Sequence, residues 1–208
     1  MAAQTSPPLT PSNEPHADER RVERRFLMRN VPWHVYVSLH DSLEAAGSHV
    51  RMTYHRGDLE LMSPSETHED YKKIIARLLE AYAEEMDVDL NGRGSTTFRE
   101  EPKERGLEPD ECYSVGEFLG RPDIAIEVAI GNPLLDKLAV YQGLGIREVW
   151  VWQRDHLVLY VLAETDYEVA EQSLALPGLN IALLTSFVQT GGSQTKRVKA
   201  YRTALRAQ

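Results

Sequence analysis

The sequence has only one cysteine, Cys112, among its 208 residues. An intrachain disulfide is therefore excluded, which agrees with a reducing compartment, and no Cys/His cluster has the spacing of a zinc site. No apolar run approaches the roughly 20 residues that cross a bilayer, and the N-terminus lacks the apolar segment of a secretory signal. We expect a cytoplasmic protein that is not embedded in a membrane.

An excess of basic residues is also missing. The 32 Asp and Glu residues outnumber the 23 Lys and Arg residues and give a formal net charge of −9. Proteins that coat nucleic acid without sequence preference are normally basic. The acidic balance argues against that class of protein, but it is compatible with an enzyme that touches DNA only locally.

The chain is long and apolar enough for one folded domain, with 42% hydrophobic residues. Residues 1–22 are rich in Pro, Ser and charge and have no apolar period, so we expect a disordered tail before a domain that spans residues 23–208. Four arginines fall within residues 20–25. They predict a solvated helix start or a linker, and a phosphate-binding arm is the alternative.

The domain itself alternates helical and strand patterns. A strongly amphipathic helix covers residues 63–86, residues 123–130 form the most strand-like run, and a further helix covers residues 133–145. Other strands and helices lie before, between and after these segments. This order predicts an α/β (α+β) fold in a single domain, with a mixed β-sheet flanked by helices.

The strand at residues 123–130 carries two carboxylates on one face. Alternation along a strand points Asp123 and Glu127 to the same side. A carboxylate at the centre of an apolar strand is costly to bury unless it is paired or binds a metal. Glu127 is therefore a candidate functional residue, and an ordinary salt-bridged glutamate is the alternative.

Two other groups are expected to meet Glu127. Lys137 opens the following helix, with Tyr141 on the same helical face, and a crossover helix returns over its own sheet. An exposed lysine is the alternative interpretation. Asp110 precedes Glu127 by 17 residues. That separation permits two adjacent antiparallel strands, which would bring the two carboxylates together.

Two carboxylates beside an ammonium suit Mg²⁺, or Mn²⁺, which prefers oxygen ligands and keeps several waters. Such an ion lowers the pKa of a bound water and stabilises charge on a phosphate, while the lysine orients that water or neutralises the phosphorus centre. Glu69, beside His68 at the start of the amphipathic helix, is a candidate third carboxylate. Favourable charge near a helix N-terminus is the alternative explanation for Glu69.

Four segments, in this order, carry a family resemblance: "GDLELMSPSETHE", "GSTTFREE…GLEPDECYSV", "RPDIAIEVA" and "LLDKLAVYQGLGIREVWVW". Over roughly residues 30–190 the chain resembles the Uma-two family of restriction endonucleases, part of the PD-(D/E)XK nuclease superfamily. The resemblance implies a restriction-endonuclease-like core, Mg²⁺ dependence, hydrolysis of DNA phosphodiester bonds and a homodimer.

The resemblance also implies roles for individual residues. The sets that follow are catalytic Asp110, Glu127 and Lys137; metal-binding Asp110, Glu127 and Glu69; and supporting Asp123, His68 and Tyr141. "RPD" at residues 121–123 also resembles the motif aspartate, but Asp110 is preferred because two strands close around a metal better than one.

The chain departs from the superfamily at one position. The usual lysine, two residues after the motif glutamate, is replaced by Ala129, and Lys137 offers a migrated substitute. Two other functions therefore stay open. One is a catalytically degenerate nuclease-fold protein that binds nucleic acid or a protein partner, and the other is a metal-dependent hydrolase of a different phosphate ester.

Overall fold

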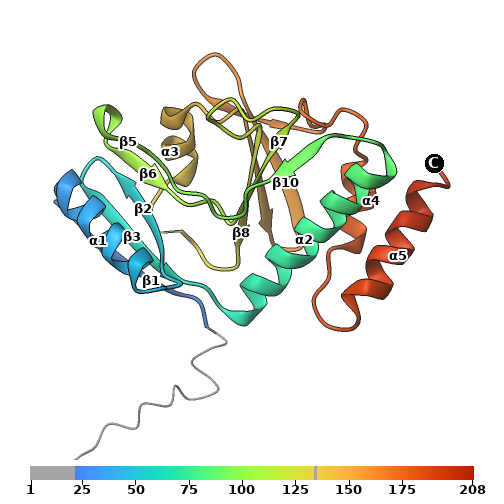
Figure 1. Ribbon diagram of the computed structural model, residues 1–208, viewed down its shortest axis with the longest axis horizontal. Coiled ribbons are helices and arrows are strands. Elements are labelled where there is room, and N and C mark those ends of the chain that lie inside the picture. Colours follow the sequence, from blue (N-terminus) through green and yellow to red (C-terminus); the bar gives the residue numbers. More distant parts are fainter. Residues whose placement is uncertain (1–21, 134) are drawn as a thin grey trace, which may run out of the picture.

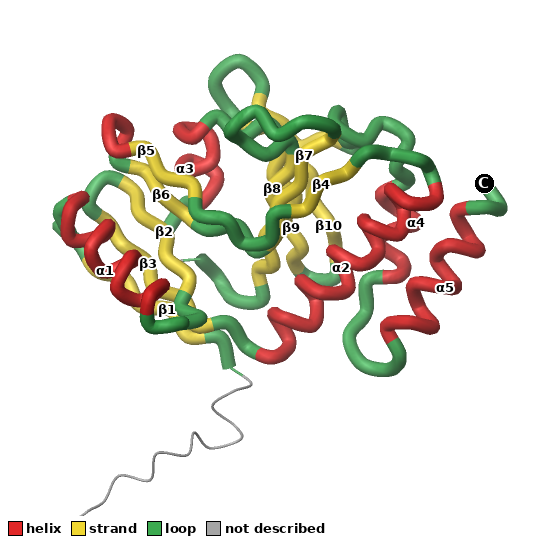
Figure 2. The backbone as a smooth tube through the Cα atoms, viewed as in Figure 1, coloured by secondary structure: helices red, strands yellow, loops and turns green. Residues whose placement is uncertain are grey.

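The structure, a computed structural model, describes residues 22–208 except residue 134. The predicted disordered tail lies outside the described residues, apart from Val22. The described chain forms two β-sheets with helices packed on and between them (Figures 1 and 2). The predicted α+β class is confirmed, although the strands divide between two sheets and only one of these is mixed.

The first sheet is antiparallel throughout and has the strand order β1-β3-β2-β6-β5. Its strands are β1 (Arg24–Met28), β2 (Arg51–His55), β3 (Asp58–Ser63), β5 (Phe98–Glu100) and β6 (Arg105–Leu107). A short 3-10 turn, η2 (Glu101–Lys103), joins β5 to β6.

The second sheet is mixed and has the order β11-β10-β9-β8-β7-β4, in which only β8 and β9 are parallel. Its strands are β4 (Leu90–Gly92), β7 (Glu111–Val115), β8 (Ile124–Ala129), β9 (Glu148–Gln153), β10 (His156–Leu162) and β11 (Tyr167–Ala170). The parallel pair is joined through α3, so the chain that leaves β8 must cross over the sheet before β9 begins.

The helices of the described chain are α1 (Trp33–Ala45), α2 (Glu66–Glu85), α3 (Lys137–Leu144), α4 (Ile181–Phe187) and α5 (Gln194–Leu205). Helix α1 covers the first sheet, while α2 packs its apolar face on the side of β8 that carries Ile124 and Ile126. None of these helices is long and apolar enough to cross a membrane.

Helix α3 lies between the two sheets, as Figure 1 shows. Its buried residues Val140 and Leu144 share one apolar cluster with Leu107 of the first sheet and Val149 of the second. A Cβ at Gly143 would overlap the Arg105 side chain, so the glycine leaves room for that side chain between the helix and β6. This packing fixes the position of the residues at the start of α3.

The interpretation of the arginine-rich segment as a helix start or linker is wrong. Residues Arg24–Met28 form strand β1, which pairs along its full length with β3. An edge strand tolerates arginines because one of its faces meets solvent. Arg25, which points to the other face, is half-buried and is held by two glutamates that are described below.

Candidate active site

Asp110 and Glu127 meet at the junction of β7 and β8. These strands are antiparallel, with Glu111 opposite Ile126, and Asp110 continues the same register by donating its N–H to the Ile126 carbonyl at 3.1 Å. Its carboxylate oxygen Oδ2 accepts the N–H of Val128 at 2.8 Å. The aspartate is therefore fixed by the backbone on both sides of Glu127.

Helix α3 brings an ammonium and a phenol to the same carboxylate. Asp136 caps the helix by accepting the Ala139 N–H at 3.2 Å, so that Lys137 is the first helical residue. Lys137 Nζ lies 2.6 Å from Glu127 Oε2. The Tyr141 hydroxyl, one turn later, donates a short hydrogen bond to Glu127 Oε1. Both oxygens of Glu127 are thus engaged.

These groups are buried and their charges are interdependent. Asp110 is 1% and Glu127 5% exposed. Burial raises the pKa of Glu127, and the Lys137 charge offsets this effect only in part. Burial also works to raise the pKa of Asp110, but the His68 contact and the Lys137 charge outweigh it and leave that pKa lowered. The pKa of Lys137 is raised, because the two carboxylates overcome the effect of burial.

His68 supplies a second positive charge. It lies in the first turn of α2, where its N–H is capped by Ser65 at 3.2 Å. Its ring nitrogen Nε2 is 3.1 Å from Asp110 Oδ2 and Nδ1 is 3.7 Å from Glu69 Oε1. Burial lowers the pKa of His68, but the two carboxylates raise it by a larger amount, so that the pKa is about 9. At neutral pH His68 is therefore a cation, which faces the Asp110 carboxylate.

The His68 charge predicts a pH-dependent stability. Its pKa is about 9 in the folded chain against 6.5 for the free side chain, so its contribution is complete below pH 6.5 and is lost as the pH rises through about 9. The difference between these two pKa values corresponds to a contribution of about 3 kcal/mol at most to the free energy of unfolding. Urea unfolding in EDTA at pH 6 and pH 9.5 measures it, with His68→Gln as the reference. If the free energy of unfolding changes equally between the two pH values in both proteins, this assignment is contradicted.

The structure separates the other predicted site residues from this centre. Glu69 lies against Lys72 at 2.9 Å and is 44% exposed, so His68 stands between Glu69 and Asp110. The contact with His68 and the ion pair with Lys72 lower the pKa of Glu69 to about 2. Asp123 accepts the Val115 N–H at 2.8 Å and so closes the turn between β7 and β8.

Two cavities border the site. A small cavity of about 190 Å³ is lined by Glu127, Lys137, Tyr141 and Ala129, the residue at the usual lysine position. A larger cleft of about 800 Å³ lies on the other side of His68 and is lined by Glu69, Lys72, Arg51 and His40, among others. Of the two carboxylates, only Glu127 lines the small cavity, whereas the wider cleft is lined by Glu69 and by neither Asp110 nor Glu127.

Comparison with known proteins identifies the family. The family model of Uma2, described as "Putative restriction endonuclease", matches residues 37–191. The chain belongs to the Uma2 family. This is the family that the four sequence segments indicated, so the resemblance is confirmed.

The Uma2 chain is only distantly similar in sequence to a solved structure of another protein. A crystal structure of a "putative nuclease" from Anabaena variabilis is 14% identical, covers 73% of this chain and 90% of its own, and has a TM-score of 0.40. That likeness is too weak to carry a functional argument. No curated protein shows significant similarity.

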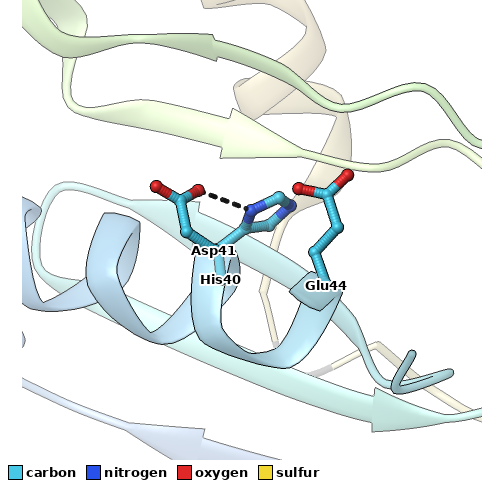
Figure 3. Close-up of side chains that lie close together, drawn as sticks. All are labelled: His40, Asp41 and Glu44. Atoms are coloured by element: carbon cyan, nitrogen blue, oxygen red, sulfur yellow. Dashed lines mark hydrogen bonds and ion pairs between the residues drawn. The ribbon is translucent and has the colours of Figure 1, made fainter. Parts of the chain in front are cut away.

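A second acid-rich group lies on helix α1 of the Uma2 chain. Figure 3 shows His40, Asp41 and Glu44, whose ligand atoms all lie within 4.8 Å of one another, and no other group of three among the described residues does so. Asp41 is already paired with Arg99 at 2.9 Å, and His40 Nε2 lies 2.8 Å from Glu108. The group is a possible metal site, separate from Asp110 and Glu127.

Sequence analysis missed three charged residues beside the site: Glu23, Arg25 and Glu60. Arg25 lines the small cavity together with Glu127 and Lys137, and it contacts Glu60 at 2.5 Å. Glu60 is 1% exposed and stands between Leu59 and Leu61 in β3. A carboxylate inside an apolar strand is the same signal that singled out Glu127, and it could have identified Glu60.

Proposed function

We propose that this Uma2 chain is a metal-dependent endonuclease that hydrolyses DNA phosphodiester bonds at Asp110, Glu127 and Lys137. The observation that carries the proposal is that Lys137 and Tyr141 of the crossover helix both bond to the buried Glu127 carboxylate, while Asp110 accepts the N–H of the next residue, Val128. Membership in a family described as restriction endonucleases supports DNA as the substrate. The predicted homodimer rests on the resemblance alone.

The residues at this site fit a divalent cation such as Mg²⁺. Asp110 Oδ1 is buried and accepts no hydrogen bond from the described residues, so one ligand position is open. Each oxygen of Glu127 accepts one hydrogen bond, and a carboxylate oxygen has a second lone pair for a metal. Asp110 and Glu127 would hold the ion. When bound, it would supply an activated water and stabilise charge on the phosphate.

The two residues from α3 act through charge and hydrogen bonding rather than as bases. The raised pKa of Lys137 keeps it an ammonium at neutral pH, and the pKa of Tyr141 is raised well above its usual value by burial and by the Glu127 charge. Both groups therefore keep their protons. They fix the orientation of Glu127, and Lys137 places a positive charge beside the position proposed for the phosphate.

One observation favours a second function, that of a nuclease-fold protein that binds but does not cut. The positive charges of His68 and Lys137 already balance the negative charges of Asp110 and Glu127. A divalent ion would therefore bind an electrically balanced site, which lowers its affinity. Under this alternative the chain would not bind Mg²⁺ or Mn²⁺ at millimolar concentration.

Cleavage and metal binding, measured together, separate the two functions. We expect the full chain to cut plasmid or linear DNA with Mg²⁺ or Mn²⁺ and not with EDTA. Glu127→Gln should abolish cutting, and Asp110→Ala should abolish Mn²⁺ binding followed by electron paramagnetic resonance. Glu168→Gln, on the exposed strand β11, is the matched control, which should keep both DNA cutting and Mn²⁺ binding. Metal binding without cutting, or cutting that survives in Glu127→Gln, contradicts the endonuclease assignment.

A further inference from the structure

Three charged side chains, two from the first sheet and one from the residue just before β1, are buried beside the connection from β8 to α3. Arg25 donates to Glu23 Oε1 through Nε at 2.8 Å and to Glu60 Oε1 through Nη1 at 2.5 Å. The side chains of Glu23, Arg25 and Glu60 are 5%, 9% and 1% exposed. We call these three residues the Arg25 clamp. A buried charged group of this kind is costly, and it is stable only while all its members are paired.

The two glutamates of the clamp contact the connection near both of its ends. Glu60 Oε2 accepts the N–H of Leu135 at 3.3 Å. Glu23 Oε1 lies so close to Gly131 that a Cβ there would stand 3.1 Å from it. Gly131 is two residues beyond the end of β8, and Leu135 is two residues before Lys137. The clamp thus lies beside the chain where it leaves β8, and it is hydrogen-bonded to the chain just before Lys137.

The clamp also governs which cation pairs with Glu127. Arg25 and Lys137 line the same small cavity, and the Arg25 charge opposes the protonated form of Lys137. An arginine that is free to turn would compete with Lys137 for the Glu127 carboxylate. Its two hydrogen bonds to Glu23 and Glu60 keep it on the first sheet.

We propose that Arg25 and Glu60 are positioning residues, which place the Lys137 ammonium on Glu127 by fixing the start of α3. Leu135 is held by Glu60, Asp136 caps the helix, and Lys137 then lies 2.6 Å from Glu127. The first sheet therefore contributes to the site without touching the reacting groups. The proposal concerns the geometry of Lys137, and its consequence for catalysis rests on the proposed nuclease function.

Acylation of lysines followed by mass spectrometry tests this placement without any assay of activity. Lys137 is 14% and Lys103 42% exposed, so Lys103 reports general reactivity. We expect Lys137 to react about tenfold faster in Glu60→Gln than in the unmodified chain, because the lost ion pair with Arg25 is worth about a tenfold change in a local opening equilibrium. Lys103 should react at an unchanged rate.

Matched variants show whether this effect is specific. Arg25→Gln should raise Lys137 reactivity as Glu60→Gln does, while Arg25→Lys, which keeps the charge, should restore part of the protection. Glu168→Gln, on the exposed strand β11, should change nothing. Circular dichroism shows whether each variant is folded, and the comparison of Arg25→Gln with Arg25→Lys carries the test if Glu60→Gln does not fold. Unchanged Lys137 reactivity in folded clamp variants overturns the proposal.

Cleavage kinetics supply a second readout. In Glu60→Gln we expect kcat to fall by about 10²-fold, because a displacement of about 1 Å at a reacting group can cost that much, with KM unchanged. A KM that rises while kcat stays constant would place the clamp in substrate binding and overturn the proposal. If the unmodified chain cuts no DNA, the nuclease function fails, and the acylation result still decides the placement of Lys137.

Discussion

Replacing Lys137 by methionine is expected to lower the free energy of unfolding by about 3–5 kcal/mol, the usual cost of removing one partner from a buried ion pair. Glu127 is 5% exposed, and its Oε2 has the ammonium as its partner at 2.6 Å. Methionine matches the length of lysine but leaves that oxygen without a counter-charge. Urea unfolding at pH 7.5 measures the loss.

The loss should depend on pH in a defined direction. Burial already raises the pKa of Glu127, and removal of Lys137 raises it further. As the pH falls through this raised pKa, the carboxyl group of the variant takes up a proton and the cost of its unpaired charge disappears. The difference in stability between Lys137→Met and the unmodified chain should therefore shrink at low pH.

A double-variant cycle separates the ion pair from loss of packing. Glu127→Gln in the Lys137→Met background should recover part of the lost stability, with a coupling energy of about 2–3 kcal/mol. DNA cleavage should not recover in the double variant, because the Lys137 charge is still absent and Glu127→Gln also removes a proposed metal ligand. Lys103→Met, on the exposed surface, should change stability by less than about 0.5 kcal/mol. Additive effects in the cycle would argue against the pairing.

Local pattern was sufficient for the elements whose burial follows a simple period. The helical spacing of Ile75, Leu78 and Leu79 predicts α2, and the same residues form its buried face in the structure. The strand around Glu127 was identified by its continuous apolar run. The encounter of Lys137 with Glu127 followed because both belong to one strand–helix unit, ten residues apart.

Partners that are distant in sequence could not be predicted in this way. Glu60 carries the same local signal as Glu127, but its contact with Leu135 joins residues 75 positions apart. Pairing of β2 with β6 across the first sheet is equally distant, so the separation into two sheets left no local trace. In the arginine-rich segment, Arg25 became half-buried only because glutamates from outside β1 and from β3 neutralise it.

The second large effect is expected at Glu148, which is fully buried in β9 and whose hydrogen bonds in the described chain come from neutral donors. Its oxygens accept the Trp150 indole N–H at 3.0 Å, the Ser173 hydroxyl at 2.8 Å and the Ala175 N–H at 2.6 Å. These bonds tie the segment after β11 to the second sheet. The segment then contributes Leu176 and Leu179 to the main apolar core.

Glu148→Ala should therefore lower the free energy of unfolding by about 3–5 kcal/mol, because it leaves three buried donors without an acceptor and opens a cavity. Glu148→Gln should cost less, since its amide oxygen still accepts while its NH₂ group faces donors that it cannot satisfy. Glu168→Ala, exposed on β11, should be close to neutral. Hydrogen exchange adds a local readout, because protection of the Ala175 and Leu176 amides should be lost first. If Glu148→Ala unfolds at the same urea concentration as Glu168→Ala, the carboxylate does not anchor this segment.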